Sequence, residues 1–273
     1  MDNEFDYIKM ISDFGDSIKN GLETVKVFSE SFECGVKKVY NFFEYLESIN
    51  YQDLLNNFEE GLKINVESIN KYLLKENWYL PNISLENMID LLNIINDESL
   101  EDKEKYKAVD FIMQEIVSKS KDNLKSKLNF KFEERQSIFE EMFKAYEEER
   151  YILCIPVMLA QIDGICNKIL GVNFFSKEYE MKNTPKTKRA IERKISEKSL
   201  NKLEISELIP LYFVSKFFKK INNENILNRH NILHGTSYMY GNKLNADKCI
   251  ALIGFLLKVD NIINGELYAE ESV

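Results

Sequence analysis

The two histidines of this 273-residue chain lie in one short segment, LNRHNILHGTSYMYG, directly after an arginine. These residues are Arg229, His230 and His234. Histidine gains and loses a proton near neutral pH, so it can act as a general acid or base. Arginine stays charged, and its planar guanidinium suits a phosphate or a developing phosphorane. The residue types therefore suit chemistry at a phosphate group.

Three structural interpretations of the segment stay open on spacing alone. The histidines, four positions apart, could bind a metal, but the zinc-protease pattern needs Glu where this chain has Asn231, and there is no third histidine. They could instead be core residues, or cap a helix that ends before Gly235. Arg229 could also form a structural ion pair with an acid such as Asp163, which is compatible with catalysis.

The elements that must position these residues are predicted to be helices. Apolar residues recur at steps of three, four or seven along most of the chain. Ten glycines and four prolines are too few to supply the frequent turns of a sandwich or barrel, so we expect an all-α fold. The predicted helices cover residues 8–32, 36–46, 54–74, 85–95, 109–128, 138–146, 151–170, 200–220 and 245–264.

Two of these segments carry more specific expectations. Residues 151–170 are apolar almost all round, which is typical of a helix in the middle of a core, with Pro156 in its first turn or at a bend. The charged stretch 96–107 is interpreted as a solvated linker, in preference to the polar first turn of the next helix. Pro210 is expected to interrupt or start the helix over 200–220.

Cysteine usage and hydropathy indicate the compartment. The four cysteines include no CxxC pair, so we expect reduced, mostly buried thiols of a cytosolic protein. The acidic, amphipathic start of the chain does not resemble a signal peptide. The longest apolar run, residues 249–257, is far too short to span a bilayer. We expect a soluble cytoplasmic protein with no membrane partner.

Charge is distributed unevenly along the chain. The formal net charge is −9, and residues 1–60 hold thirteen acids and five lysines, a net −8. A protein-wide basic field for nucleic acid is therefore absent. Residues 182–198 hold seven Lys or Arg against two Glu. This basic segment is expected either to hold an RNA backbone or to be a solvated loop.

The segment NRHNILHG and the helices around it resemble the HEPN superfamily, whose ribonucleases carry Arg, a polar residue, three residues and His. Arg229, His230 and His234 match these positions. Residues 139–170 resemble the first helical hairpin of such domains, with Asp163 as the acid near the end of the apolar helix. The resemblance covers about residues 132–265. Some HEPN toxins have a tyrosine two residues after the His, where this chain has Thr236, which puts control through that tyrosine in doubt.

The resemblance implies a helical bundle of HEPN type that dimerises, so that the Arg-x4-His segments of two subunits meet in a cleft. Active members are endoribonucleases that need no metal or cofactor. An RNA 2′-OH attacks the adjacent phosphate, leaving a 2′,3′-cyclic phosphate and a 5′-OH. In this chain His234 would be the general base or acid, Arg229 would stabilise the phosphate charge and His230 would orient the phosphate or assist proton transfer. Asp163 and Asn231 would support them.

We therefore expect three segments: an acidic helical domain over residues 1–100, a connecting helical segment over 101–131 and a HEPN-like domain over 132–273. The first would bind an antitoxin or sensor protein, and the last would form a homodimer that cleaves RNA. The expected role is a toxin or an antiviral, abortive-infection effector. Residues expected to bind the RNA backbone are Lys186, Lys188, Arg189 and Arg193.

Two other functions stay open. The first is a non-catalytic HEPN-type module that binds a partner protein, an antitoxin or a nucleotide. The second is an unrelated helical scaffold, in which the region of Arg229 and His234 would be buried and remote from any groove or dimer axis.

Overall fold

The computed structural model describes residues 51–178, 184–213 and 227–265, with the backbone alone over 51–59. The chain divides into two compact units, Met1–Phe58 and Glu59–Val273. The predicted helices over 8–32 and 36–46 lie outside the described residues. The described residues form nine α-helices and one two-stranded antiparallel sheet, which confirms the predicted all-α fold.

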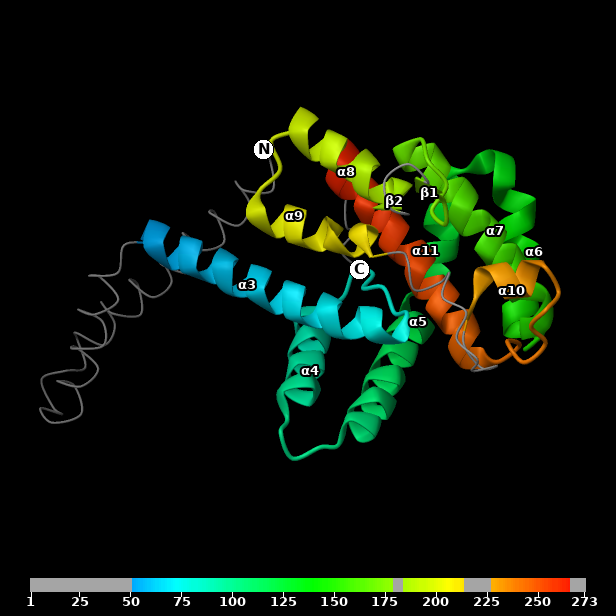
Figure 1. Cartoon of the computed structure of the whole chain (residues 1–273), viewed down its shortest axis with the longest axis horizontal. Coiled ribbons are helices and arrows are strands. Elements are labelled where there is room, and N and C mark those ends of the chain that lie inside the picture. Colours follow the sequence, from blue (N-terminus) through cyan, green and yellow to red (C-terminus); the bar gives the residue numbers. More distant parts are fainter. Residues whose placement is uncertain (1–50, 179–183, 214–226, 266–273) are drawn as a thin grey trace, which may run out of the picture. The chain divides into compact units, whose positions relative to one another are not determined.

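Figure 1 shows how the described helices are arranged. In chain order they are α3 (Tyr51–Leu73), α4 (Leu85–Asn96), α5 (Asp102–Lys131), α6 (Gln136–Glu147), α7 (Tyr151–Leu170), α8 (Lys186–Glu197), α9 (Lys202–Leu208), α10 (Arg229–Leu233) and α11 (Lys243–Asn264). The strands β1 (Lys177–Glu178) and β2 (Thr184–Pro185) pair between α7 and α8. In the described part of the predicted helix over 200–220, Pro210 begins a separate 3-10 turn, Ile209–Tyr212, after α9.

Helix α5 begins earlier than predicted. Glu101 caps it and forms a reciprocal capping box with Glu104, which provides partners for two backbone N–H groups of the first turn. The acids Asp102 and Glu104 also interact favourably with the positive end of the helix dipole. Only residues 97–101 connect α4 to α5, so the interpretation of 96–107 as a linker is wrong for its second half.

Helix α11 lies at the centre of the core, between α7 and α5 (Figure 1). Sixteen of its residues are buried, and they include charged residues such as Asp247 and Lys258, which form ion pairs with Lys243 and Glu207. Gly254 lets the Pro81 side chain approach closely, since a Cβ at this glycine would lie 3.1 Å from Pro81 Cβ. Of the residues predicted to face inward, Ile262 is partly exposed. The others are almost completely buried: Ile250, Ile253, Phe255, Leu256 and Val259.

Helix α7 is confirmed at its predicted bounds, but it is not buried all round. Nine of its residues belong to the core, whereas Ile152 and Leu153 are more than half exposed and Val157 is 36% exposed. Length and hydropathy alone would let α7 cross a membrane, but its core residues are consistent with a helix of a soluble protein. Pro156 is the sixth residue of the helix, beyond the first turn.

Residues before 101 share the core of the C-terminal half. Trp78, Tyr79 and Leu80 are almost fully buried, and the Tyr79 ring lies 5.3 Å from that of Phe255 in α11. The compact unit that starts at Glu59 thus includes residues 59–100 of the predicted segment 1–100 and the whole of the predicted segment 101–131. These segments join the core because their apolar faces pack on the same helices.

The described cysteines match the expectation of reduced, buried thiols. Cys154, Cys166 and Cys249 are free and buried, and Cys34 lies outside the described residues. Burial raises the pKa of Cys154 to about 11, because the thiolate is poorly solvated in the core. Burial also raises the pKa of the other two thiols. Such thiols are unreactive at neutral pH.

Candidate active site

The Arg-x4-His segment folds into α10 and the turn that follows it. Asn228 caps the helix, and its side-chain oxygen accepts the Asn231 N–H at 3.1 Å. His234 is the C-cap residue, and Gly235 follows in the left-handed conformation with a φ of +70°. The Asn231 carbonyl accepts the N–H and the hydroxyl of Thr236, at 2.9 and 3.2 Å. The backbone of Asn231 therefore holds the turn that follows His234.

The two imidazoles lie side by side at the surface. The ring centroids of His230 and His234 are 4.3 Å apart, and the ring planes are inclined by 55°. Both residues are exposed, which excludes the interpretation that they are buried core residues. The helix-cap interpretation holds for the backbone position of His234. The paired rings are accessible to a molecule in solution.

Arg229 is tied to α7 by an ion pair. Its Nη2 donates to Asp163 Oδ2 at 3.0 Å, and the Arg229 side chain is 30% exposed. The second oxygen, Asp163 Oδ1, accepts the backbone N–H of Phe175 at 3.0 Å. The guanidinium carbon lies 5.5 Å from the centroid of the Phe175 ring. The ion pair considered from the sequence is present, and a ring that the sequence analysis did not single out accompanies it.

The chain beyond His234 is attached to the other end of α7. Pro156 has no N–H to donate to the Ile152 carbonyl, four residues earlier in the helix. The Tyr240 hydroxyl donates to this carbonyl at 3.2 Å. Gly241 packs so closely that a Cβ there would overlap Ile152 Cγ1. The segment from Arg229 to Gly241 is therefore attached to α7 at two points.

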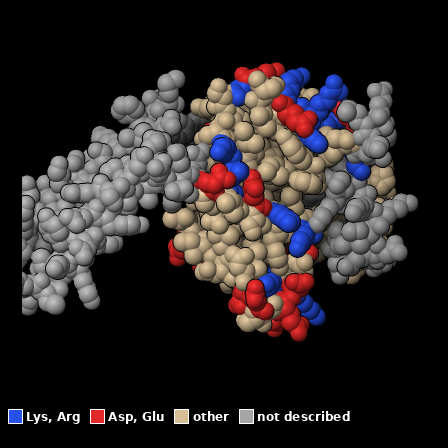
Figure 2. Space-filling model, turned by 60° about the vertical axis from the view of Figure 1, so that its left-hand side comes forward, with Lys and Arg blue, Asp and Glu red and all other residues tan. Residues whose placement is uncertain are grey.

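The predicted RNA-backbone residues lie on α8, which is a helix and not a loop. Three of the four are paired with acids: Lys188 with Glu192 at 3.8 Å, Arg189 with Glu178 at 3.4 Å and Arg193 with Glu197 at 3.8 Å. The Lys186 backbone N–H donates to the Ser176 carbonyl at 3.0 Å, and within the described part of the chain its side chain makes no hydrogen bond or ion pair. Figure 2 shows basic and acidic side chains interspersed on the face in view, which agrees with the absence of a broad basic field.

The structure joins none of these four α8 residues to Arg229 or the histidines by an ion pair or hydrogen bond within the described ranges. It pairs Arg229 with Asp163 of α7 and places the His230 and His234 rings beside each other on the same short segment, which packs against α7. Among the described residues there is also no group of three or more His, Cys, Asp or Glu side chains that could hold a metal.

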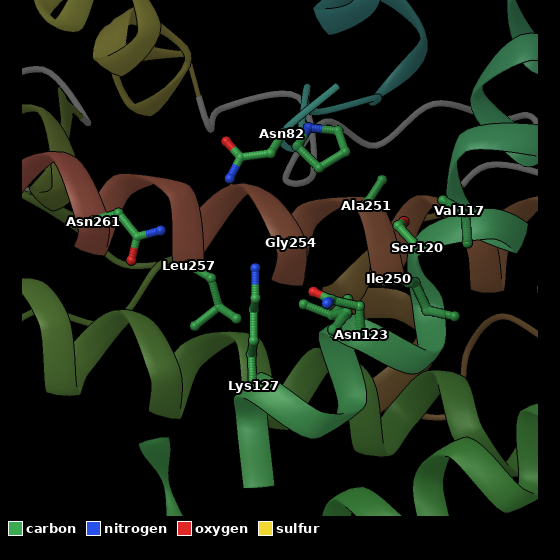
Figure 3. Close-up of a pocket in the computed structure, with 12 residues that line it drawn as sticks. Asn82, Val117, Ser120, Asn123, Lys127, Ile250, Ala251, Gly254, Leu257 and Asn261 are labelled. Atoms are coloured by element: carbon green, nitrogen blue, oxygen red, sulfur yellow. The ribbon is translucent and has the colours of Figure 1, made fainter. Parts of the chain in front are cut away.

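A pocket lies elsewhere, between α5, α11 and the loop at Pro81, and Figure 3 shows its lining. Its floor is apolar, and its polar groups come from residues that include Asn82, Lys127 and Asn261. None of the predicted site residues lines it. This pocket is therefore separate from the candidate site.

The sequence analysis missed Phe175 and Tyr240. Phe175 follows the end of α7 by five residues, and no motif marks a ring that will lie against an arginine 54 positions later. The signal for Tyr240 was available, because a proline inside a predicted helix leaves one carbonyl without its helical donor. The pattern did not show which group would supply the donor.

Comparisons of the chain with family models, with curated proteins and with solved structures gave no match.

Proposed function

We propose that this protein is a metal-independent endoribonuclease of the HEPN type. The observation that carries the proposal is the exposed pair of imidazoles, 4.3 Å apart, on the same short helical segment as an arginine fixed by Asp163. These are a proton donor and acceptor beside a permanent positive charge. Cleavage of RNA by its own 2′-OH needs both.

In the proposed reaction one imidazole accepts the proton of the 2′-OH as its oxygen attacks the adjacent phosphorus. The bond from phosphorus to the 5′-oxygen breaks, and that oxygen leaves with a proton supplied by a second group. The products are a 2′,3′-cyclic phosphate and a 5′-OH. His234 acts as general base or acid, His230 orients the phosphate or assists proton transfer, and Arg229 stabilises the charge on the phosphate oxygens.

The proposed working form is a symmetric homodimer. Apolar residues stay exposed on α7 and on the segment that contains the histidines, which is the usual property of an interaction surface. A two-fold axis near this surface would bring a second Arg-x4-His segment to the same RNA. The exposed apolar residues are Ile152, Leu153, Val157, Leu233, Tyr238 and Met239.

The proposed cellular role is a cytoplasmic toxin or antiviral effector of the abortive-infection kind. Residues 1–100 would bind an antitoxin or a sensor protein. On α8, Arg189 and Arg193 have side chains 72% and 64% exposed. Both can leave their weak surface ion pairs to contact the RNA backbone, because exposed pairs contribute about 0–1 kcal/mol.

The test is cleavage of RNA by the purified protein in the presence of EDTA. We expect the wild type to cut and Arg229→Ala and His234→Ala to lose activity. Arg150→Ala is the matched control, because Arg150 is 46% exposed and, among the residues that the structure describes, pairs only with Glu148 at the turn before α7. It should cleave like the wild type. Equal cleavage by all four proteins would exclude the proposed site.

The second candidate is a non-catalytic module that binds a partner protein. The exposed apolar residues of α7 favour it, because such a surface binds proteins whether or not the histidines react. It predicts a stable complex, no cleavage and a phenotype that survives His234→Ala. A growth assay with wild type and His234→Ala distinguishes the two functions.

A further inference from the structure

Asp163 connects two segments that are distant in sequence. One carboxylate oxygen accepts the Phe175 N–H and the other accepts Arg229 Nη2, both at 3.0 Å. The Asp163 side chain is only 15% exposed, so these charge-assisted bonds are partly shielded from water. The position of Arg229 is therefore tied to the loop over residues 171–176.

This loop is held firmly. Gly171 ends α7 in the left-handed conformation and donates its N–H to the Asn167 carbonyl at 2.8 Å. The Asn167 side chain donates to that of Asn173 at 2.9 Å. Phe174 and Phe175 are 0% and 5% exposed, and their rings are 5.0 Å apart. Phe175 thus cannot shift without disturbing the core.

The Arg229 guanidinium depends on this ring for its orientation. Nη2 is bonded to Asp163, whereas Nε is buried and makes no hydrogen bond to any described part of the chain. A single bonded nitrogen leaves the guanidinium free to rotate about that bond. The Phe175 face, 5.5 Å from the guanidinium carbon, restricts that rotation and attracts the cation.

We propose that Phe175 is a positioning residue for Arg229. Its backbone N–H orients the Asp163 carboxylate, and its ring fixes the plane of the guanidinium, so that the edge of Arg229 that carries Nη1 is presented in one orientation. If Phe175 positions Arg229, it also affects catalysis, and this consequence rests on the proposed function, in which this edge binds the reacting phosphate. The positioning itself does not depend on that function.

The test compares Phe175→Leu with Phe139→Leu. The first keeps the backbone N–H and an apolar side chain but removes the aromatic face. The second removes a similarly buried ring on α6, whose ring contact among the described residues is with Phe132 and not with Arg229. The first measurement is the rate at which phenylglyoxal modifies Arg229, and mass spectrometry monitors this modification over time. The second is kcat and KM for RNA cleavage. Phe175→Met is a second variant, should Phe175→Leu fail to give a native circular dichroism spectrum.

We expect modification of Arg229 to speed up several-fold in the Phe175 variant and to stay at the wild-type rate in Phe139→Leu. We expect kcat to fall about tenfold, because a misplaced group that acts in the transition state lowers kcat more than it changes KM. In an Arg229→Lys background, Phe175→Leu should cause no comparable further loss.

An unchanged modification rate in the Phe175 variants would overturn the proposal, as would an equal increase in Phe139→Leu. If the wild type does not cleave RNA, the proposed function fails. The modification rates still decide whether Phe175 positions Arg229, so the two failures are distinguishable.

Discussion

The Tyr240 hydroxyl donates a hydrogen bond to the Ile152 carbonyl, which is the carbonyl that Pro156 leaves without a helical donor. A tertiary contact thus replaces the missing bond of α7 and holds the chain that follows the histidines. The bond spans 88 positions of sequence, so it fixes the site segment to the core helix.

This relationship predicts a coupling between two substitutions. Tyr240→Phe should lower the free energy of unfolding by about 1 kcal/mol, because it removes one hydrogen bond. The loss should be smaller in a Pro156→Ala background, where residue 156 regains an N–H that can bond to the Ile152 carbonyl. Urea denaturation of the four proteins measures the coupling. Equal losses of unfolding free energy in both backgrounds would show that the Tyr240 hydroxyl does not substitute for the missing N–H of Pro156.

Gly235 predicts a second effect, at the end of α10. Its φ of +70° disfavours any residue with a Cβ, although no atom lies within 4 Å of the place a Cβ would occupy. Gly235→Ala should therefore cost about 1 kcal/mol through backbone strain alone. Gly235→Asn should cost less, since asparagine tolerates this conformation better. Thermal unfolding compares the variants, and an Ala variant as stable as wild type would show that the turn rearranges.

Tyr72 predicts a dependence of stability on alkaline pH. Burial raises its pKa from 10.0 to about 12, so the folded state disfavours the tyrosinate. As pH rises from 10 towards 12, the unfolded chain releases this proton while the folded chain retains it, and stability is lost. Tyr72→Phe should reduce this loss.

The same substitution should also raise stability at neutral pH by about 1 kcal/mol, because the buried Tyr72 hydroxyl has no hydrogen-bond partner among the described residues. Urea denaturation below and above pH 10 measures both effects. Tyr238→Phe, at a tyrosine that is 72% exposed, is the control. A pH dependence identical in Tyr72→Phe and wild type would exclude Tyr72 as its source.

The open face of α7 predicts the outcome of introducing a charge. Leu153 is 56% exposed, so Leu153→Glu should leave the monomer folded. If this face forms the proposed homodimer, the buried charge should abolish dimerisation and RNA cleavage together. Phe111→Glu on α5, at a site 66% exposed, is the matched control. Analytical ultracentrifugation gives the oligomeric state, and a dimer that persists in Leu153→Glu would place the interface elsewhere.

Helical periodicity predicted most of the described fold, because an amphipathic stripe such as that of α6 is a local property. It failed at α5, where acids of the first turn at Asp102 and Glu104 resemble a polar linker until the capping box is recognised. It also failed to predict that one face of α7 is exposed, since the apolar sequence of this helix indicated burial on all sides. Apolar sequence shows that a face avoids water, but not whether this chain or another molecule covers it.

The candidate site was predictable only in part. Arg229, His230 and His234 are close in sequence, so their spacing places them on one short segment. The pairing of Arg229 with Asp163, 66 positions away, was one of several options that spacing left open. No pattern in the sequence marks the contact of Phe175 with Arg229 and Asp163. Pro156 does mark the Ile152 carbonyl as lacking a helical donor, but not that Tyr240 supplies one.

The central position of α11 has a consequence for the order in which the protein can be made. α11 follows the Arg229–His234 segment in the chain, yet α7 and α5 pack against it. Until residue 264 has left the ribosome, the faces of α7 and α5 that support the site have nothing to bury themselves against. The packed arrangement that holds Arg229 and Asp163 in place can therefore be completed only after α11 is synthesised.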